Sequence, residues 1–130
     1  MQATVSWQND LKFSCKTDTG HELTLDGNGQ ALSPMESVLL SVGACSSIDV
    51  VDILQKSRKQ IDDCVCKLEA KRADEPPRVF TTIDAHYQVK GQGLTDKNVA
   101  RAVQLSAEKY CSVMLMLAGN VEITTSYEIV

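Results

Sequence analysis

Five cysteines are the residues of this 130-residue chain with the most distinctive chemistry: Cys15, Cys45, Cys64, Cys66 and Cys111. The count is odd, and the N-terminus lacks the basic and then apolar segments of a secretory signal. We therefore expect a cytoplasmic protein in a reducing compartment, where structural disulfides are uncommon. Each cysteine is then a packed small side chain, a metal ligand or a redox group. The residues around each cysteine indicate which of these three roles it has.

Cys45 and Cys111 each fall near the middle of a predicted apolar helix. The small residues Gly43 and Ala44 beside Cys45 would allow another segment or a small molecule to approach closely. A free cysteine often packs as a small hydrophobe, so an inert interpretation stands beside the reactive one. A position in mid-helix also denies Cys45 the helix N-terminus that lowers a thiol pKa, and Glu108 would disfavour a thiolate at Cys111.

Cys64 and Cys66 lie two residues apart on a predicted strand, so their sulfurs point to the same face. Together with Cys15 they are the best candidates for a metal site, but a C-x-C pair lacks the second ligand pair of typical zinc sites. His21 and His86 are isolated and not at ligand spacing. We therefore interpret these three cysteines as structural and expect neither a metal nor a cofactor.

Composition indicates an ordinary globular chain, with 43% hydrophobic and 23% charged residues. Its length suits a single domain over residues 1–130. The formal net charge is -4 and the basic residues are scattered, so we expect no binding to nucleic acid or to an anionic membrane. The most apolar stretch contains Glu36, Asp49 and Asp52, which favours a buried helix over a membrane span.

The pattern of apolar residues predicts an α+β fold with the order βββ-α-ββ-α-β. Ser33-Pro34-Met35-Glu36 is a capping box with proline at the first helical position, so a helix should run from there to about Ser57. A second helix should run from Thr95 to a stop at Gly119-Asn120. Short runs between turn residues predict strands over residues 3–7, 11–17 and 21–26. A hairpin of two longer strands is expected over residues 61–73, where the alternation is imperfect, and 79–90, where it is clear, and a final alternating strand over residues 121–129. Both helices are apolar almost all round, so we expect a homodimer with a large apolar interface.

Two segments resemble the motifs of the OsmC/Ohr family, the osmotically inducible and organic hydroperoxide resistance proteins. Residues 33–45, SPMESVLLSVGAC, followed by residues 48–54, IDVVDIL, resemble the motif around the family's first cysteine. Residues 101–113, RAVQLSAEKYCSV, resemble the motif around the second. Length and element order agree, and the chain looks closest to the YhfA-type OsmC-like branch.

The resemblance implies an intertwined homodimer in which antiparallel sheets wrap two long central helices, with active sites at the dimer interface. It also implies thiol-dependent reduction of organic hydroperoxides, which protects against oxidative stress. Cys45 would attack the peroxide and become a sulfenic acid, and Cys111 would resolve it as a Cys45–Cys111 disulfide. A small dithiol or a lipoylated protein would then reopen that disulfide. The alternatives are an OsmC-like dimer that binds a small ligand, or a redox sensor that exchanges thiols.

Charged groups are where this chain departs from the family pattern. In the family, a glutamate in the Pro-x-Glu region and an arginine from the N-terminal strands organise the reactive thiol. Glu36 matches the glutamate, although its capping box already explains it. Residues 1–57 contain no arginine, and Lys12 and Lys16 are the lysines of the N-terminal strands. Arg78 and Arg101 are the possible substitutes, whereas a lysine lacks the guanidinium's fork of donors.

Overall fold

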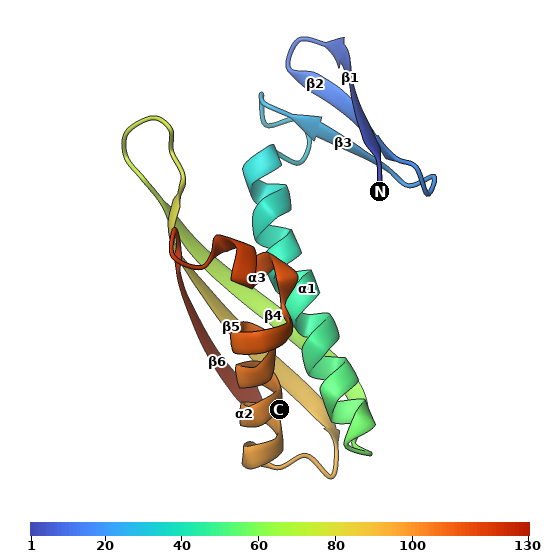
Figure 1. Ribbon diagram of the computed structural model, residues 1–130, viewed down its shortest axis with the longest axis vertical. Coiled ribbons are helices and arrows are strands. Elements are labelled where there is room, and N and C mark those ends of the chain that lie inside the picture. Colours follow the sequence, from blue (N-terminus) through green and yellow to red (C-terminus); the bar gives the residue numbers. More distant parts are fainter. The chain divides into compact units, whose positions relative to one another are not determined.

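The computed structural model describes all 130 residues and divides them into two compact units, Met1–Leu40 and Ser41–Val130. The first unit holds an antiparallel sheet in the order β1-β2-β3, as predicted (Figure 1). Its strands are β1 (Ala3–Asn9), β2 (Lys12–Thr17) and β3 (Glu22–Asp26). The turn between β1 and β2 places Asp10 at φ 44°, a left-handed conformation that aspartate tolerates better than most residues.

Asp26 closes this unit at the end of β3. Its carboxylate is buried and accepts the backbone N–H groups of Asn28 at 3.0 Å and Gln30 at 2.9 Å. Hydrogen bonds to the charged form, with Asn28 the largest contributor, lower the pKa of Asp26. The side chain therefore fixes the loop that leads into the first helix.

Helix α1 (Pro34–Lys56) begins at the predicted capping box. The Ser33 hydroxyl accepts the N–H of Glu36, and a Glu36 carboxylate oxygen accepts the N–H of Ser33, both at 3.1 Å. By length and composition alone α1 is apolar enough to cross a membrane. Within the second unit, however, its residues Val42, Val50 and Leu54 are buried in the protein core.

The second unit is built on a mixed sheet in the order β4-β5-β6. Strands β4 (Gln60–Arg72) and β5 (Phe80–Gln92) form the predicted hairpin. Strand β6 (Glu122–Ile129) runs parallel to β5, which corrects the expectation of purely antiparallel sheets. The parallel pairing follows because the chain crosses over through helices before it returns to the sheet.

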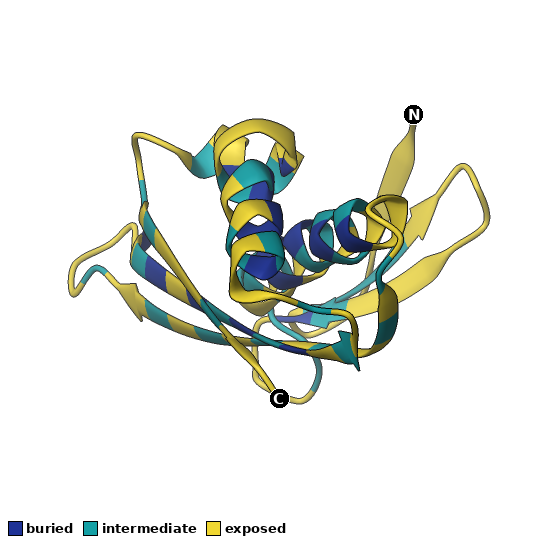
Figure 2. Cartoon of the chain, turned by 90° about the horizontal axis from the view of Figure 1, so that it is seen from below, coloured by how far each residue is buried: buried dark blue, intermediate teal, exposed yellow.

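Three helical segments cross from β5 to β6 where one long helix is predicted. They are α2 (Asp96–Leu105), a π-helical turn η1 (Ser106–Tyr110) and α3 (Ser112–Leu117). The helices of this unit lie on one face of its sheet, and buried residues gather where the two layers meet (Figure 2). At the sheet side the core comprises Phe80, Ile83, Ala85, Tyr87 and Val89, every one of them on β5.

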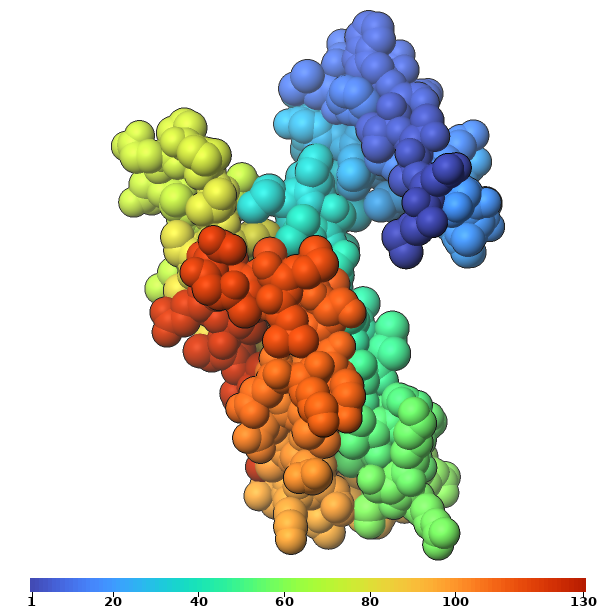
Figure 3. Space-filling view, in the orientation of Figure 1, coloured from blue at the N-terminus to red at the C-terminus, as the bar shows by residue number.

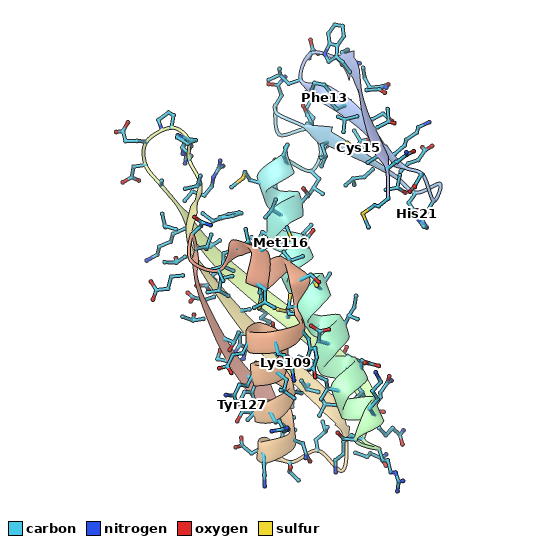
Figure 4. All side chains as sticks on the ribbon, in the orientation of Figure 1. Phe13, Cys15, His21, Lys109, Met116 and Tyr127 are labelled. Carbon is cyan, nitrogen blue, oxygen red and sulfur yellow. The ribbon has the colours of Figure 1, made fainter.

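Large apolar side chains remain exposed in both units. Ile48 on α1 is 68% exposed. Met116 on α3, which Figure 4 labels, is 77% exposed. In the N-terminal sheet, Trp7 is 67% exposed and Val5 is 64% exposed. The expected enclosure of the apolar helices on several sides is therefore not achieved within one chain.

Candidate functional site

Cys45 and Cys111 lie close together although they are far apart in the sequence. Cys45 is among the groups that raise the pKa of the Cys111 thiol, so the two side chains are near enough to interact. Cys45 lies within α1, as predicted, and is partly exposed, whereas Cys111 is fully buried. The structure thus brings together the two residues that the sequence motifs single out.

Cys111 does not lie within a helix, which corrects the prediction of a mid-helix position. Its backbone is extended, with φ -70° and ψ 105°, and it forms the N-cap of α3. The preceding π turn ends with a hydrogen bond from the Cys111 N–H to the Ser106 carbonyl at 2.8 Å. A π turn fits one more residue into the helix than an α turn would, so the chain can leave the helical path at Cys111.

Burial raises the pKa of the Cys111 thiol to about 11. The backbone N–H of Met114, which lies 3.4 Å from the Cys111 sulfur, opposes that effect, and Cys45 adds to it. Desolvation raises the pKa of Cys111 more than the N–H donors lower it, because the thiol is wholly enclosed. No cation is among the groups that set this pKa, so Cys111 is a neutral thiol at physiological pH.

A network of buried hydroxyl groups adjoins the two thiols. Tyr87 of β5 donates from its hydroxyl to Ser46 Oγ at 2.6 Å, and Ser46 Oγ donates to the Val42 carbonyl at 2.7 Å. Ser106 of the π turn donates to Asp49 Oδ2 at 2.9 Å and approaches the Ser46 carbonyl at 3.3 Å. These bonds fasten α1 to the sheet on one side and to η1 on the other, which holds Cys45 and Cys111 in place.

Around these hydrogen bonds, α2 and η1 pack against the C-terminal part of α1. In the space-filling view the orange segment of α2 and η1 lies directly beside the green C-terminal half of α1 (Figure 3). Tyr127 of β6 donates to Asp96 Oδ1 at 2.9 Å and so ties the start of α2 to the sheet (Figure 4). Each helix that carries part of the site is therefore anchored at a second point.

The charged candidates have local partners. Glu36 belongs to the first unit, and the Ser33 hydroxyl, followed by the Ser33 N–H, lowers the pKa of its carboxyl group. Arg78 lies in the loop between β4 and β5, where its Nε donates to the Ala73 carbonyl at 3.4 Å. Arg101 is exposed on α2. Glu108, suspected of disfavouring a thiolate at Cys111, is exposed and accepts from the Gln104 side chain.

The remaining cysteines divide between the units. Cys15 lies on β2 (Figure 4), while Cys64 and Cys66 lie on β4. Burial raises the pKa of the Cys66 thiol overall, while the hydroxyls of Ser47 and Tyr87 have the opposite, smaller effect. No group of three or more histidine, cysteine and carboxylate side chains is arranged to hold a metal ion.

Sequence reasoning missed the hydroxyl network around the thiols. Ser46 and Ser106 are fully buried, and Tyr87 is 1% exposed. The available signal was a serine on the apolar stripe of each helix, since a buried hydroxyl requires a hydrogen-bond partner. The identity of that partner depends on tertiary packing, which places Tyr87 beside Ser46.

Two thiols held close together by helices packed on one face of a mixed sheet define an α+β protein with a potential thiol redox site. A family model described as OsmC-like protein matches residues 27–126. Protein YhfA of Escherichia coli (strain K12) is 54% identical over 132 residues, which cover 100% of this chain and 98% of YhfA. The chain therefore belongs to the OsmC-like family.

Solved structures agree with this assignment. A hypothetical protein from Aquifex aeolicus VF5 is 33% identical, with a TM-score of 0.91 over 99% of this chain and 95% of that chain. An organic hydroperoxide resistance protein from Legionella pneumophila is 18% identical, with a TM-score of 0.71 over 98% of this chain and 95% of that chain. The second likeness establishes a shared fold.

Proposed function

We propose that this protein reduces organic hydroperoxides, with Cys45 as the attacking thiol and Cys111 as the resolving thiol. The observation that carries the proposal is the proximity of the two thiols, which interact closely enough for Cys45 to raise the pKa of Cys111. The OsmC-like family and the name of the Legionella structure support the choice of substrate class. The difference in burial supports the assignment of roles, since the partly exposed Cys45 is the thiol that a substrate can reach.

The first step consumes the peroxide. The Cys45 thiolate attacks the distal oxygen of the hydroperoxide, the O–O bond breaks, and the alkoxide leaves as an alcohol after it gains a proton. Cys45 is thereby oxidised to a sulfenic acid. The family resemblance assigns Glu36 to the reactive site, where its carboxylate would orient a cation, since its negative charge alone would disfavour a thiolate.

The second step closes the disulfide without a free Cys111 thiolate. The Cys111 sulfur attacks the Cys45 sulfur, and the sulfenic hydroxyl leaves with the Cys111 proton as water. This route suits a thiol whose pKa is raised to about 11, because proton transfer accompanies bond formation. An external dithiol, small or carried on a lipoylated protein, then reduces the disulfide by exchange.

One equivalent of cumene hydroperoxide added to the reduced protein tests this mechanism. We expect mass spectrometry to find a Cys45–Cys111 disulfide, and the rate of peroxide consumption to fall more than about 100-fold in Cys45→Ser. Cys111→Ser should accumulate sulfenic or further oxidised Cys45. Cys15→Ser is the matched control and should react like the wild type.

The proposal fails if no Cys45–Cys111 disulfide forms in the native chain. If Cys45→Ser consumes peroxide at the wild-type rate, the assignment of the attacking residue is wrong. A slow redox sensor is the second candidate, and the absence of arginine from residues 1–57 favours it. A disulfide that forms stoichiometrically but with slow turnover would identify the sensor.

We further propose that two copies of the chain associate through their exposed apolar surfaces. Ile48 and Met116 in the second unit, and Trp7 and Val5 in the first, are more exposed than such side chains usually are. Sedimentation velocity should show a dimer, and dilution into the monomer range should shift the emission of Trp7, the single tryptophan, to longer wavelength. A monomer at all concentrations would contradict this assembly.

A further inference from the structure

His86 lies on the central strand β5 and points to the outer face of its sheet, the face away from the helices (Figure 2). Its neighbours Ala85 and Tyr87 are each 1% exposed and belong to the core, so the alternation of the strand directs His86 outward. The ladder pairs His86 with Lys67 of β4 on one side and with Ser126 of β6 on the other. An ammonium, an imidazole and a hydroxyl group therefore form one row across this face.

Both nitrogens of the His86 ring have a partner. Nδ1 lies 2.7 Å from Ser126 Oγ, and Nε2 lies 3.3 Å from Glu128 Oε1. The side-chain amide of Gln88 donates to the same carboxylate oxygen at 2.6 Å. Hydrogen bonds from Gln88 and then from His86 lower the pKa of Glu128, so its carboxyl group is charged at neutral pH.

The charge on Glu128 determines the direction of the hydrogen bonds to the neutral ring. A carboxylate only accepts hydrogen bonds, so Nε2 carries the ring hydrogen and donates it to Glu128. Nδ1 then has a free lone pair, which accepts the hydrogen of the Ser126 hydroxyl. A hydroxyl group bonded to a base that a third group orients is the arrangement that activates a serine nucleophile.

Ser126 also borders a groove of about 500 Å³ between β6 and α2. The lining of this groove includes Ala100, Val103 and Tyr127, so part of it is apolar. Because β6 is an edge strand, no further strand of its own sheet separates Ser126 from the groove. None of the lining residues is among the exposed apolar residues proposed above to contact a second copy, so that contact leaves Ser126 accessible.

We propose that Ser126 is a nucleophile that hydrolyses small carboxylic esters, with His86 as its general base and Glu128 as the residue that positions His86. The Ser126 oxygen attacks the carbonyl carbon of the ester while its proton passes to His86 Nδ1. The bond to the leaving group breaks, His86 returns the proton to that group, and an alcohol or phenol departs from acylated Ser126. Water then attacks the acyl group with His86 as base, which releases the carboxylic acid and restores the serine.

The open face of the sheet limits the substrates to esters with good leaving groups. Lys67 is the cation opposite His86 in the ladder, and it also contributes to the lowered pKa of Glu128. An exposed ammonium group stabilises the negative charge on the carbonyl oxygen less than enclosed donors would. Phenyl esters, whose phenolate departs readily, are therefore the expected class of substrate.

A fluorophosphonate probe, which phosphonylates activated serines, tests the nucleophile in the full-length wild-type chain. Peptide mapping by mass spectrometry should find the adduct on Ser126 and not on Ser6, an exposed serine of β1 in the same sample. Because both serines are compared within one sample, the result does not depend on the folding of any variant. The absence of an adduct on Ser126, or equal adducts on the two serines, would overturn the proposal.

Two variants test the groups on either side of the imidazole. His86→Gln should slow labelling of Ser126 about 100-fold, the lower end of what a positioned general base contributes. Glu128→Gln keeps an acceptor for the Nε2 hydrogen but removes the charge, so it should slow labelling by a smaller factor. A wild-type rate in His86→Gln would remove His86 from the mechanism, and a wild-type rate in Glu128→Gln would remove Glu128.

Steady-state hydrolysis of p-nitrophenyl acetate tests turnover. Thiols also take acetyl groups from this ester, so the measured quantity is the part of the p-nitrophenolate release that depends on Ser126. We expect Ser126→Ala to lower the steady-state rate about tenfold, while the matched control Ser6→Ala keeps it. Equal rates in the two variants would reject ester hydrolysis. This activity uses no cysteine, so neither result bears on the peroxide chemistry proposed above.

Discussion

The two thiol pairs of this protein are built in opposite ways. Cys45 and Cys111 meet only because α1 and the end of η1 pack together, whereas Cys64 and Cys66 are neighbours on a single strand. The first pair depends on the tertiary fold and contains a fully buried thiol. The second pair exists wherever β4 is extended. A pair made by packing can be tuned through the helices, while a pair made by a strand has a fixed separation.

Tyr87 connects the two regions. Its hydroxyl donates to Ser46 Oγ. Burial is the main cause of its raised pKa, and the thiols of Cys66 and Cys111 add to that effect. The buried hydroxyl group of Tyr87 therefore lies near a cysteine of each pair.

The largest expected effect is the loss of stability that follows the titration of Cys111. The pKa of Cys111 is about 11 in the folded protein and near its ordinary value of 9.0 when unfolded. Between these values the unfolded chain has lost the proton that the folded chain retains, so stability declines as pH rises. We expect a loss of about 2 kcal/mol across this window that is absent from Cys111→Ala.

Urea unfolding at several pH values within this window measures the effect. Cys111→Ser is the control, because it also removes the titrating thiol and should give the same slope as Cys111→Ala. Parallel curves for the wild type and both variants would show that burial does not dominate at Cys111.

The next effect concerns the hydrogen bond between Tyr87 and Ser46, which lies near both thiol pairs. Ser46→Ala removes the acceptor of the Tyr87 hydroxyl, which is buried, and should lower the free energy of unfolding by about 1–3 kcal/mol. Ser57→Ala is a matched control, since Ser57 also donates to a carbonyl four residues earlier but is exposed. It should cost less than about 0.5 kcal/mol. Equal losses in the two variants would mean that the Tyr87–Ser46 bond contributes little.

The smallest effect defines how far the first site extends along α1. Glu36→Gln keeps a side chain able to complete the capping box but removes its charge, so thermal unfolding should be almost unchanged. If the charge organises the peroxide site, turnover should fall about threefold, the effect of a partly exposed charge worth under 1 kcal/mol. Glu36→Ala should also cost about 1 kcal/mol of stability. Wild-type turnover in Glu36→Gln would leave Glu36 as a cap alone.

Local rules predicted much of the fold. The capping box at Ser33 and the N-cap at Thr95 lie where their side-chain chemistry requires, and the alternating strands are confirmed within a few residues. The break at Cys111 could not be predicted, because Val113-Met114-Leu115-Met116-Leu117 is apolar like the helix before it. What stops the helix is the π turn, and that turn depends on contacts of Ser106 with α1.

The candidate site was predictable only as a list of residues. Sequence motifs identified Cys45 and Cys111, but not the burial that raises the pKa of Cys111 or the hydroxyls around Cys66. Desolvation and hydrogen bonding to a group from another element arise from packing, so they leave no local pattern in the chain.

The π turn at Ser106–Tyr110 places one residue more between Ser106 and Cys111 than an α turn would. The Cys111 N–H closes this turn on the Ser106 carbonyl. Deleting one residue within the turn would let the cysteine N–H close an ordinary α turn on the same carbonyl, so the thiol would keep its place beside α1. Across related chains, a single-codon deletion here is therefore a change in chain length that both the fold and the thiol pairing can survive.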